Sequence, residues 1–140
     1  MVWNSLGELI KELETAGSMR DPVRMGELQQ HILDFDEPDA APLNEYAHGM
    51  IHEFRGDYDV AYEHHRQALE GFQKTGNEDF CARVTNNIGS IYYFKSDFPR
   101  ALEQFQKSID IRTRLGLPIT NELNNIGAVH YNVGDFKTAL

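Results

Sequence analysis

Three stretches of the chain repeat one arrangement of glycine and alanine, and this repetition restricts the possible folds more than any other feature. The stretches align without gaps over residues 45–62, 85–102 and 123–140. All three stretches share a glycine, which is Gly49, Gly89 or Gly127. Twelve residues later each has an alanine, which is Ala61, Ala101 or Ala139. The glycines are 40 and then 38 residues apart. A period of this size is typical of stacked supersecondary units that bury their apolar faces against one another.

Each unit is predicted to contain two helices joined by a tight turn. The first helix should end near Gly56, Ser96 or Gly134, because glycine takes the left-handed C-cap conformation at little cost. The next residue in each unit, Asp57, Asp97 or Asp135, is a good N-cap for the second helix. Pro99 falls in the first turn of the second helix, where its missing N–H is harmless. The second helices should end at Gly76 and Gly116. No segment predicts a strand, so we expect an all-α fold.

The first 40 residues fit the repeat poorly and predict a helical hairpin of their own. SLGELIKELETA indicates one helix, and the second begins with Asp21 as N-cap and Pro22 at its first position. We therefore expect one solenoid fragment over residues 1–140. Its parts are an atypical hairpin (1–40), repeat 1 (41–76), repeat 2 (77–116) and an incomplete repeat 3 (117–140). Because Leu140 falls early in a second helix, the chain is expected to be a piece of a longer array or multidomain protein.

The glycine, the Gly-Asp-aromatic turn and the alanine together resemble tetratricopeptide (TPR) repeats over about residues 42–140. The small residue of the family's second helix is matched by Ala68 and Ser108. The units are longer than the usual 34 residues, and in this they resemble kinesin light chains, spindle adaptors of the LGN type and bacterial TPR sensor segments. The resemblance implies a right-handed α-solenoid of stacked antiparallel hairpins, whose first helices line a concave groove.

One face of these first helices carries a row of residues that we call the polar stripe. Asn86 and Asn87 sit in a helix that asparagine disfavours, and Asn124 and Asn125 repeat the doublet. At helical spacing the stripe comprises Tyr46, Met50, Glu53, Arg83, Asn86, Asn87, Ser90, Tyr93, Asn121, Asn124, Asn125, Ala128 and Tyr131, with Asn132 continuing it. By resemblance to TPR proteins, the stripe lines the groove, where amides suit a peptide backbone. Alternatively, the asparagines bond neighbouring repeats to each other.

The carboxylate clamp of chaperone-binding TPR proteins is not predicted. Among its five positions only Asn87 matches. Tyr46 and Met50 occupy the positions on the first helix, and Asn121 and Asn125 stand where cations belong. A groove so poor in cations should prefer a neutral or basic peptide segment.

Composition excludes several classes of partner. The formal net charge of −9 disfavours a nucleic-acid backbone. No apolar run approaches the roughly 18 residues of a membrane span, and no secretion signal opens the chain. The single cysteine, Cys81, fits a reducing compartment. The sequence thus indicates a cytoplasmic protein.

The histidines are the remaining candidates for chemistry. His48 and His52 are spaced i, i+4 with Glu45 one turn earlier, a geometry that can hold a metal. Their register is one where TPR helices pack together, so packing histidines are predicted and no metal. His64 and His65 are predicted on the outer side of the second helix. No catalytic motif is present, so neither an enzyme nor a cofactor is expected.

The sequence therefore predicts a protein- or peptide-binding TPR scaffold. The alternative is a regulatory or oligomerisation module of a larger bacterial signalling protein such as a kinase, nucleotide cyclase or transcription regulator. Self-association through the C-terminal end is also expected, through apolar residues Val129, Val133 and Phe136 exposed by the incomplete repeat.

Overall fold

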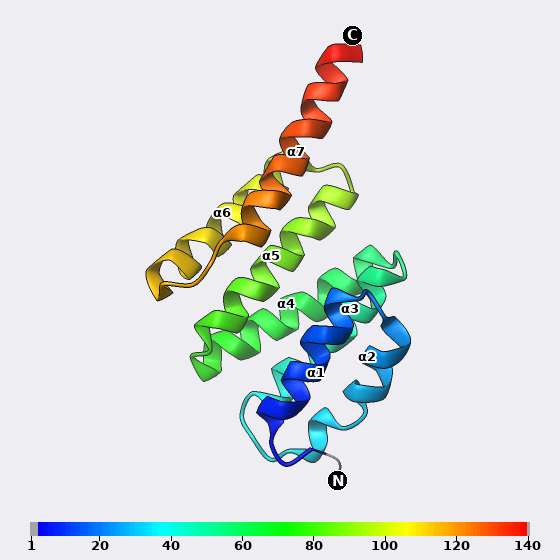
Figure 1. Cartoon of the computed structure of the whole chain (residues 1–140), viewed down its shortest axis with the longest axis vertical. Coiled ribbons are helices and arrows are strands. Elements are labelled where there is room, and N and C mark those ends of the chain that lie inside the picture. The colour runs from blue at the N-terminus through cyan, green and yellow to red at the C-terminus, as the bar shows by residue number, and fades with distance from the viewer. Residues whose placement is uncertain (1–2, 140) are drawn as a thin grey trace. The chain divides into compact units, whose positions relative to one another are not determined.

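The computed structural model describes the backbone of residues 3–139 and the side chains of residues 3–134. The chain divides into two compact units, Met1–Asn77 and Glu78–Leu140, each described here by itself. The elements are α1 (Leu6–Ser18), α2 (Pro22–Gln29), the short 3-10 helix η1 (Ile32–Asp34), α3 (Ala40–Phe54), α4 (Tyr58–Thr75), α5 (Glu78–Phe94), α6 (Phe98–Leu115) and α7 (Thr120–Ala139) (Figure 1). Residues 3–139 contain no strand, which confirms the all-α class of TPR-like helix hairpins.

The first unit opens with the hairpin of α1 and α2, as predicted. The side chain of Asp21 accepts a hydrogen bond from the backbone N–H of Arg24 at 3.0 Å, and Pro22 follows at the first helical position. Buried Leu9, Met25 and Leu28 fill the inner face of this hairpin. Helix α2 then packs against α3, and α3 against α4.

A close helix approach holds α3 and α4 together. A Cβ atom added at Gly49 would lie 2.6 Å from the ring of His65 in α4. The side chain of His65 is fully buried there, so its predicted place on the outer side of α4 was wrong. The cause is the crossing of the two helices. The space beside Gly49, which has no side chain, is filled by the ring of His65 from the facing helix. The predicted left-handed residues Gly56 and Gly76 are confirmed, with φ of 82° and 76°.

Helices α5 and α6 of the second unit repeat this hairpin. A Cβ atom at Gly89 would lie 2.6 Å from the ring of Phe105. Ser96, two residues after the end of α5, has a φ of 62°, the left-handed conformation that glycine adopts at the equivalent turn. Asp97 caps α6 by accepting from the N–H of Arg100 at 3.3 Å.

A buried polar group joins α6 to α7. The Ser108 hydroxyl lies 2.8 Å from the carbonyl oxygen of Ala82 and 3.0 Å from Oε1 of Glu122. Ser108 and Glu122 are both buried, at 0% and 3% exposed. Arg112 approaches the same carboxylate oxygen to 3.6 Å.

Two predictions about the third repeat were wrong. Helix α7 continues through Gly134 to Ala139 instead of turning there. A glycine inside a helix costs only about 1 kcal/mol, so Gly134 alone does not end α7. The predicted exposure of Val129 is also wrong. Val129 is fully buried against Ala101 and Phe105 of α6, with Val133 partly buried beside it. The side chains of Asp135, Phe136 and Ala139 lie outside the described residues.

Candidate functional site

Two side-chain hydrogen bonds join α5 and α7 along the polar stripe. The amide nitrogen of Asn125 donates to Oδ1 of Asn86 at 3.0 Å, and that of Asn132 donates to the Tyr93 hydroxyl at 2.6 Å. Both pairs are partly buried and are separated by 39 residues in sequence. One asparagine of each doublet therefore bonds the neighbouring repeat. This geometry matches the bridging interpretation for Asn86 and Asn125.

The other stripe residues of α7 face solvent beside these bonds. Asn121 and Asn124 are exposed, Ala128 is half-buried, and Tyr131 is 70% exposed. Their exposure leaves amide and phenol groups of α7 accessible to a ligand.

On α5 the remaining stripe residues are partly buried. Asn87 and Ser90 are both half-buried, and the Ser90 hydroxyl donates to the backbone carbonyl of Asn86 at 3.3 Å. The guanidinium of Arg83 pairs with Asp79 at 3.3 Å and lies 4.7 Å from the centre of the Phe80 ring. The positive charge of Arg83 is therefore already partly neutralised within α5.

The stripe residues of the first unit face inward. Glu53 is only 6% exposed, and its Oε1 lies 3.3 Å from Nε2 of His65. The half-buried Met50 points toward α1, with its Cε 3.6 Å from where a Gly17 Cβ would be. Tyr46 is half-buried too, its ring 6.1 Å from that of His65. These contacts direct the three side chains toward the interior. Because the Glu53 carboxylate is buried, it cannot contact a ligand in this structure.

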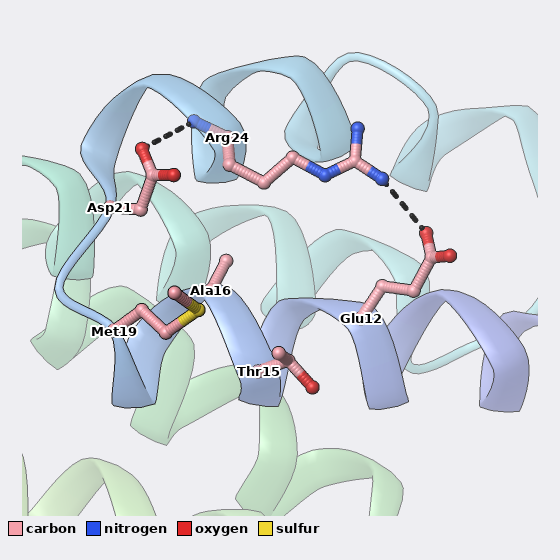
Figure 2. A pocket seen from close by; sticks show the side chains of 6 residues that line it. All are labelled: Glu12, Thr15, Ala16, Met19, Asp21 and Arg24. Carbon is pink, nitrogen blue, oxygen red and sulfur yellow. Dashed lines mark hydrogen bonds and ion pairs between the residues drawn. The ribbon is translucent and has the colours of Figure 1, made fainter.

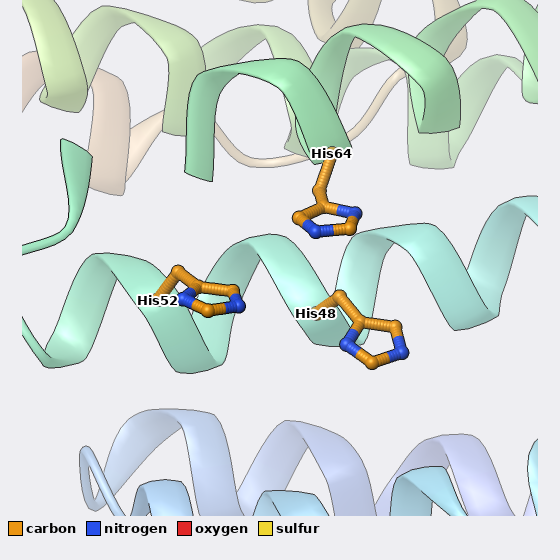
Figure 3. Close-up of side chains that lie close together, drawn as sticks. All are labelled: His48, His52 and His64. Atoms are coloured by element: carbon orange, nitrogen blue, oxygen red, sulfur yellow. The ribbon is translucent and has the colours of Figure 1, made fainter. Parts of the chain in front are cut away.

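A cluster of three histidines lies between α3 and α4. His48 and His52 project from α3, and His64 projects from α4 into the same space (Figure 3). The His64 ring stacks on both others, with centroids 5.1 Å from His48 and 5.5 Å from His52. His64 was predicted on the outer side of α4; it lies instead against α3. The sequence placed His48 and His52 on one face but missed the third member.

Carboxylates contact two of these histidines, and burial affects the third. Oε2 of Glu45 accepts a hydrogen bond from Nδ1 of His64 at 2.7 Å, and Oδ2 of Asp57 lies 3.5 Å from Nδ1 of His52. Burial, together with the neighbouring His64 and His52, holds the pKa of His48 below its ordinary value of 6.5, although Glu45 acts in the opposite direction. His48 is thus favoured as a neutral imidazole.

A shallow pocket of about 290 Å³ lies between α1 and α2. It is lined by Glu12, Thr15, Ala16, Met19, Asp21 and Arg24 (Figure 2). Arg24 pairs with Glu12 across it at 3.3 Å, and the backbone of Arg24 is bonded to Asp21. The charged side chains that line this pocket thus already have partners within the hairpin.

Comparison with known proteins agrees with the geometry of the hairpins. The family described as tetratricopeptide repeat matches residues 39–114, which span α3 to α6 and more than half of the chain. No curated protein matches the chain. Among the described residues, no helix combines the length and apolar character needed to span a bilayer.

Proposed function

The chain belongs to the tetratricopeptide repeat family, and on this premise we propose that it is a non-catalytic scaffold that binds a segment of another protein along the polar stripe of α5 and α7. Repeats of this family generally mediate protein–protein interaction. The observation that carries the proposal is the pair of bonds between α5 and α7. They hold the two helices together while Asn124 and Tyr131 remain exposed beside them.

The chemistry of this surface suits a neutral or basic segment. Each amide offers one acceptor and two donors to a peptide backbone, and tyrosine adds apolar area with a polar tip. Among the described residues of the polar stripe, Arg83 is the one cation, and it is paired with Asp79, so it is not free for a carboxylate ligand. The net charge of −9 further favours a basic partner over nucleic acid. We place this interaction in the cytoplasm, which accords with the single cysteine.

Selection of peptides on the full chain tests the proposal. Peptides enriched from a displayed library would be titrated against the wild type, Asn124→Ala and Tyr131→Ala, with chain folding checked by circular dichroism. Each substitution should weaken binding about tenfold, the loss of roughly 1.4 kcal/mol of contact. Gln106→Ala removes an exposed amide from α6 and is the matched control. If only the Gln106 variant lost binding, the stripe would not be the interface.

Asn124 and Asn125 separate ligand binding from repeat bridging. Asn124→Ala should reduce peptide affinity more than stability, whereas Asn125→Ala removes a bond to Asn86 and should chiefly reduce stability. Intact binding in Asn124→Ala, together with a loss of stability, would make the doublet structural only.

The second candidate is a regulatory or oligomerising module within a larger signalling protein. It is favoured by exposed apolar groups on α7, where Leu123 is 53% and Tyr131 70% exposed. Light scattering at increasing concentration should show a dimer that Leu123→Ser abolishes. A wild type that stays monomeric over the whole range would contradict this candidate.

A further inference from the structure

The three-histidine cluster of the α3–α4 hairpin has the components of a metal site. One ligand nitrogen from each of His48, His52 and His64 can be chosen so that all three lie within 4.8 Å of one another. They come from two helices, as Figure 3 shows, so a bound ion would connect α3 to α4. We propose that this cluster binds one divalent transition-metal ion, with Zn²⁺ as its representative.

The hairpin fold does not itself require these histidines. Adding the 40-residue repeat offset gives their counterparts in the α5–α6 hairpin, which are Ile88, Tyr92 and Gln104. That second hairpin has the same glycine approach and the same turn, yet contains none of the three imidazoles. Helix packing alone is therefore satisfied by apolar and amide side chains at these positions. Three imidazoles in one hairpin need another explanation, and metal coordination supplies it.

The carboxylates around the cluster prepare the imidazoles as ligands. Because Glu45 accepts a hydrogen bond from Nδ1 of His64 at 2.7 Å, Nδ1 of that ring carries a proton and Nε2 is the nitrogen left to ligate an ion. Oδ2 of Asp57 lies 3.5 Å from Nδ1 of His52, where it can orient that ring. Such carboxylate–histidine pairs are the usual outer shell of protein metal sites, where they fix the tautomer and the ring orientation.

The dimensions of the cluster fit a small ion after a modest adjustment. Zn–N bonds of about 2.0–2.1 Å in tetrahedral geometry place ligand nitrogens about 3.4 Å apart. Starting from nitrogens within 4.8 Å, the side chains must close by up to about 1.4 Å (4.8 − 3.4). The side chains of His52 and His64 are 27% and 28% exposed, so they have room to rotate. This exposure also lets water take the fourth coordination position.

Imidazole ligands select the metal class. Three neutral imidazoles suit Zn²⁺, Ni²⁺ or Cu²⁺, whereas Mg²⁺ and Ca²⁺ require oxygen ligands. The site should therefore not bind Mg²⁺.

Titration calorimetry with Zn²⁺ on the full chain, prepared without a histidine tag, tests the proposal. We expect one Zn²⁺ per chain, a rise in Tm on saturation because the ion binds the folded state, and no effect of Mg²⁺. His64→Gln should weaken Zn²⁺ binding at least tenfold. The triple variant H48I/H52Y/H64Q, which installs the residues of the other hairpin, should remove the site while its metal-free Tm reports that it is folded.

His130→Gln is the matched control, because His130 is exposed on α7 in the same repeat register as His52. This variant should bind Zn²⁺ as the wild type does. The proposal is overturned if the wild type binds no Zn²⁺, or if the folded triple variant binds it with unchanged affinity and stoichiometry. Loss of binding in His130→Gln would equally overturn it by moving the site to α7.

Discussion

Replacing Gly89 by alanine should destabilise the chain by about 1–2 kcal/mol, although alanine is the better helix former. The new Cβ would lie 2.6 Å from the Phe105 ring, which is 0.8 Å inside the 3.4 Å (3.4 − 2.6) where ordinary contact begins. Phe105 is 1% exposed and packed against Ala101 and Val129, so its ring has little space into which to move. Overpacking of this kind costs about 1–3 kcal/mol, and the gain in helix propensity returns about 0.5–1 kcal/mol.

Gly127→Ala is the natural control, because Gly127 has the same repeat register in α7 but no heavy atom within 4 Å of its added Cβ. Here only the propensity gain remains, so the variant should be more stable by about 0.5–1 kcal/mol. Urea unfolding of both full-length variants, followed by far-UV circular dichroism, measures the difference. If Gly89→Ala were as stable as Gly127→Ala, the close approach of α5 and α6 would not constrain the residue at position 89, and the packing argument would fail.

Three further predictions concern polar groups. In a double-mutant cycle, Asn86→Ala and Asn125→Ala should show a coupling of about 0.5–1.5 kcal/mol in unfolding free energy, the usual net value of a hydrogen bond; additive losses would mean that the bond contributes nothing. Ser108→Ala should cost about 1–3 kcal/mol because it leaves the buried Glu122 carboxylate with fewer partners, and an unchanged urea midpoint would contradict this. Because the pKa of His48 is lowered in the folded state, the unfolded chain binds more protons, so stability present above pH 6.5 is lost as the pH falls toward the folded value. The Tm of the metal-free chain should therefore fall on acidification, and less so in His48→Ile; an equal fall in both would assign the effect to other groups.

The left-handed residues at the helix ends could be predicted because they depend on local chemistry. Gly56, Gly76 and Gly116 take left-handed conformations that glycine adopts with little strain. Ser96 was predicted by its register alone and adopts the same conformation. Gly134 shows the limit of this reasoning, since glycine permits a left-handed turn without requiring one, and α7 continues through it.

Contacts between helices could be predicted only in part. The periodicity placed the asparagines in one row, but whether Asn125 reaches Asn86 depends on the spacing of α5 and α7 to within an ångström. Likewise, His64 and His65 are adjacent in sequence, and both were predicted outside. The crossing of α3 and α4 buries one under Gly49 and turns the other toward His48, and sequence periodicity carries no information on that crossing.

The two bonds between α5 and α7 also define how far one helix is shifted along the other. Asn86 and Tyr93 are seven residues apart on α5, as are Asn125 and Asn132 on α7. Apolar contacts would largely re-form if α7 slid by one turn, about 5.4 Å, but both polar bonds would break together. Their contribution is therefore greater to the choice of one alignment than to the total free energy of folding, as with a single buried asparagine in a coiled coil. In a repeat array that aligns its helices in this way, such residues select one alignment of neighbouring helices even where they add little to the stability of the fold.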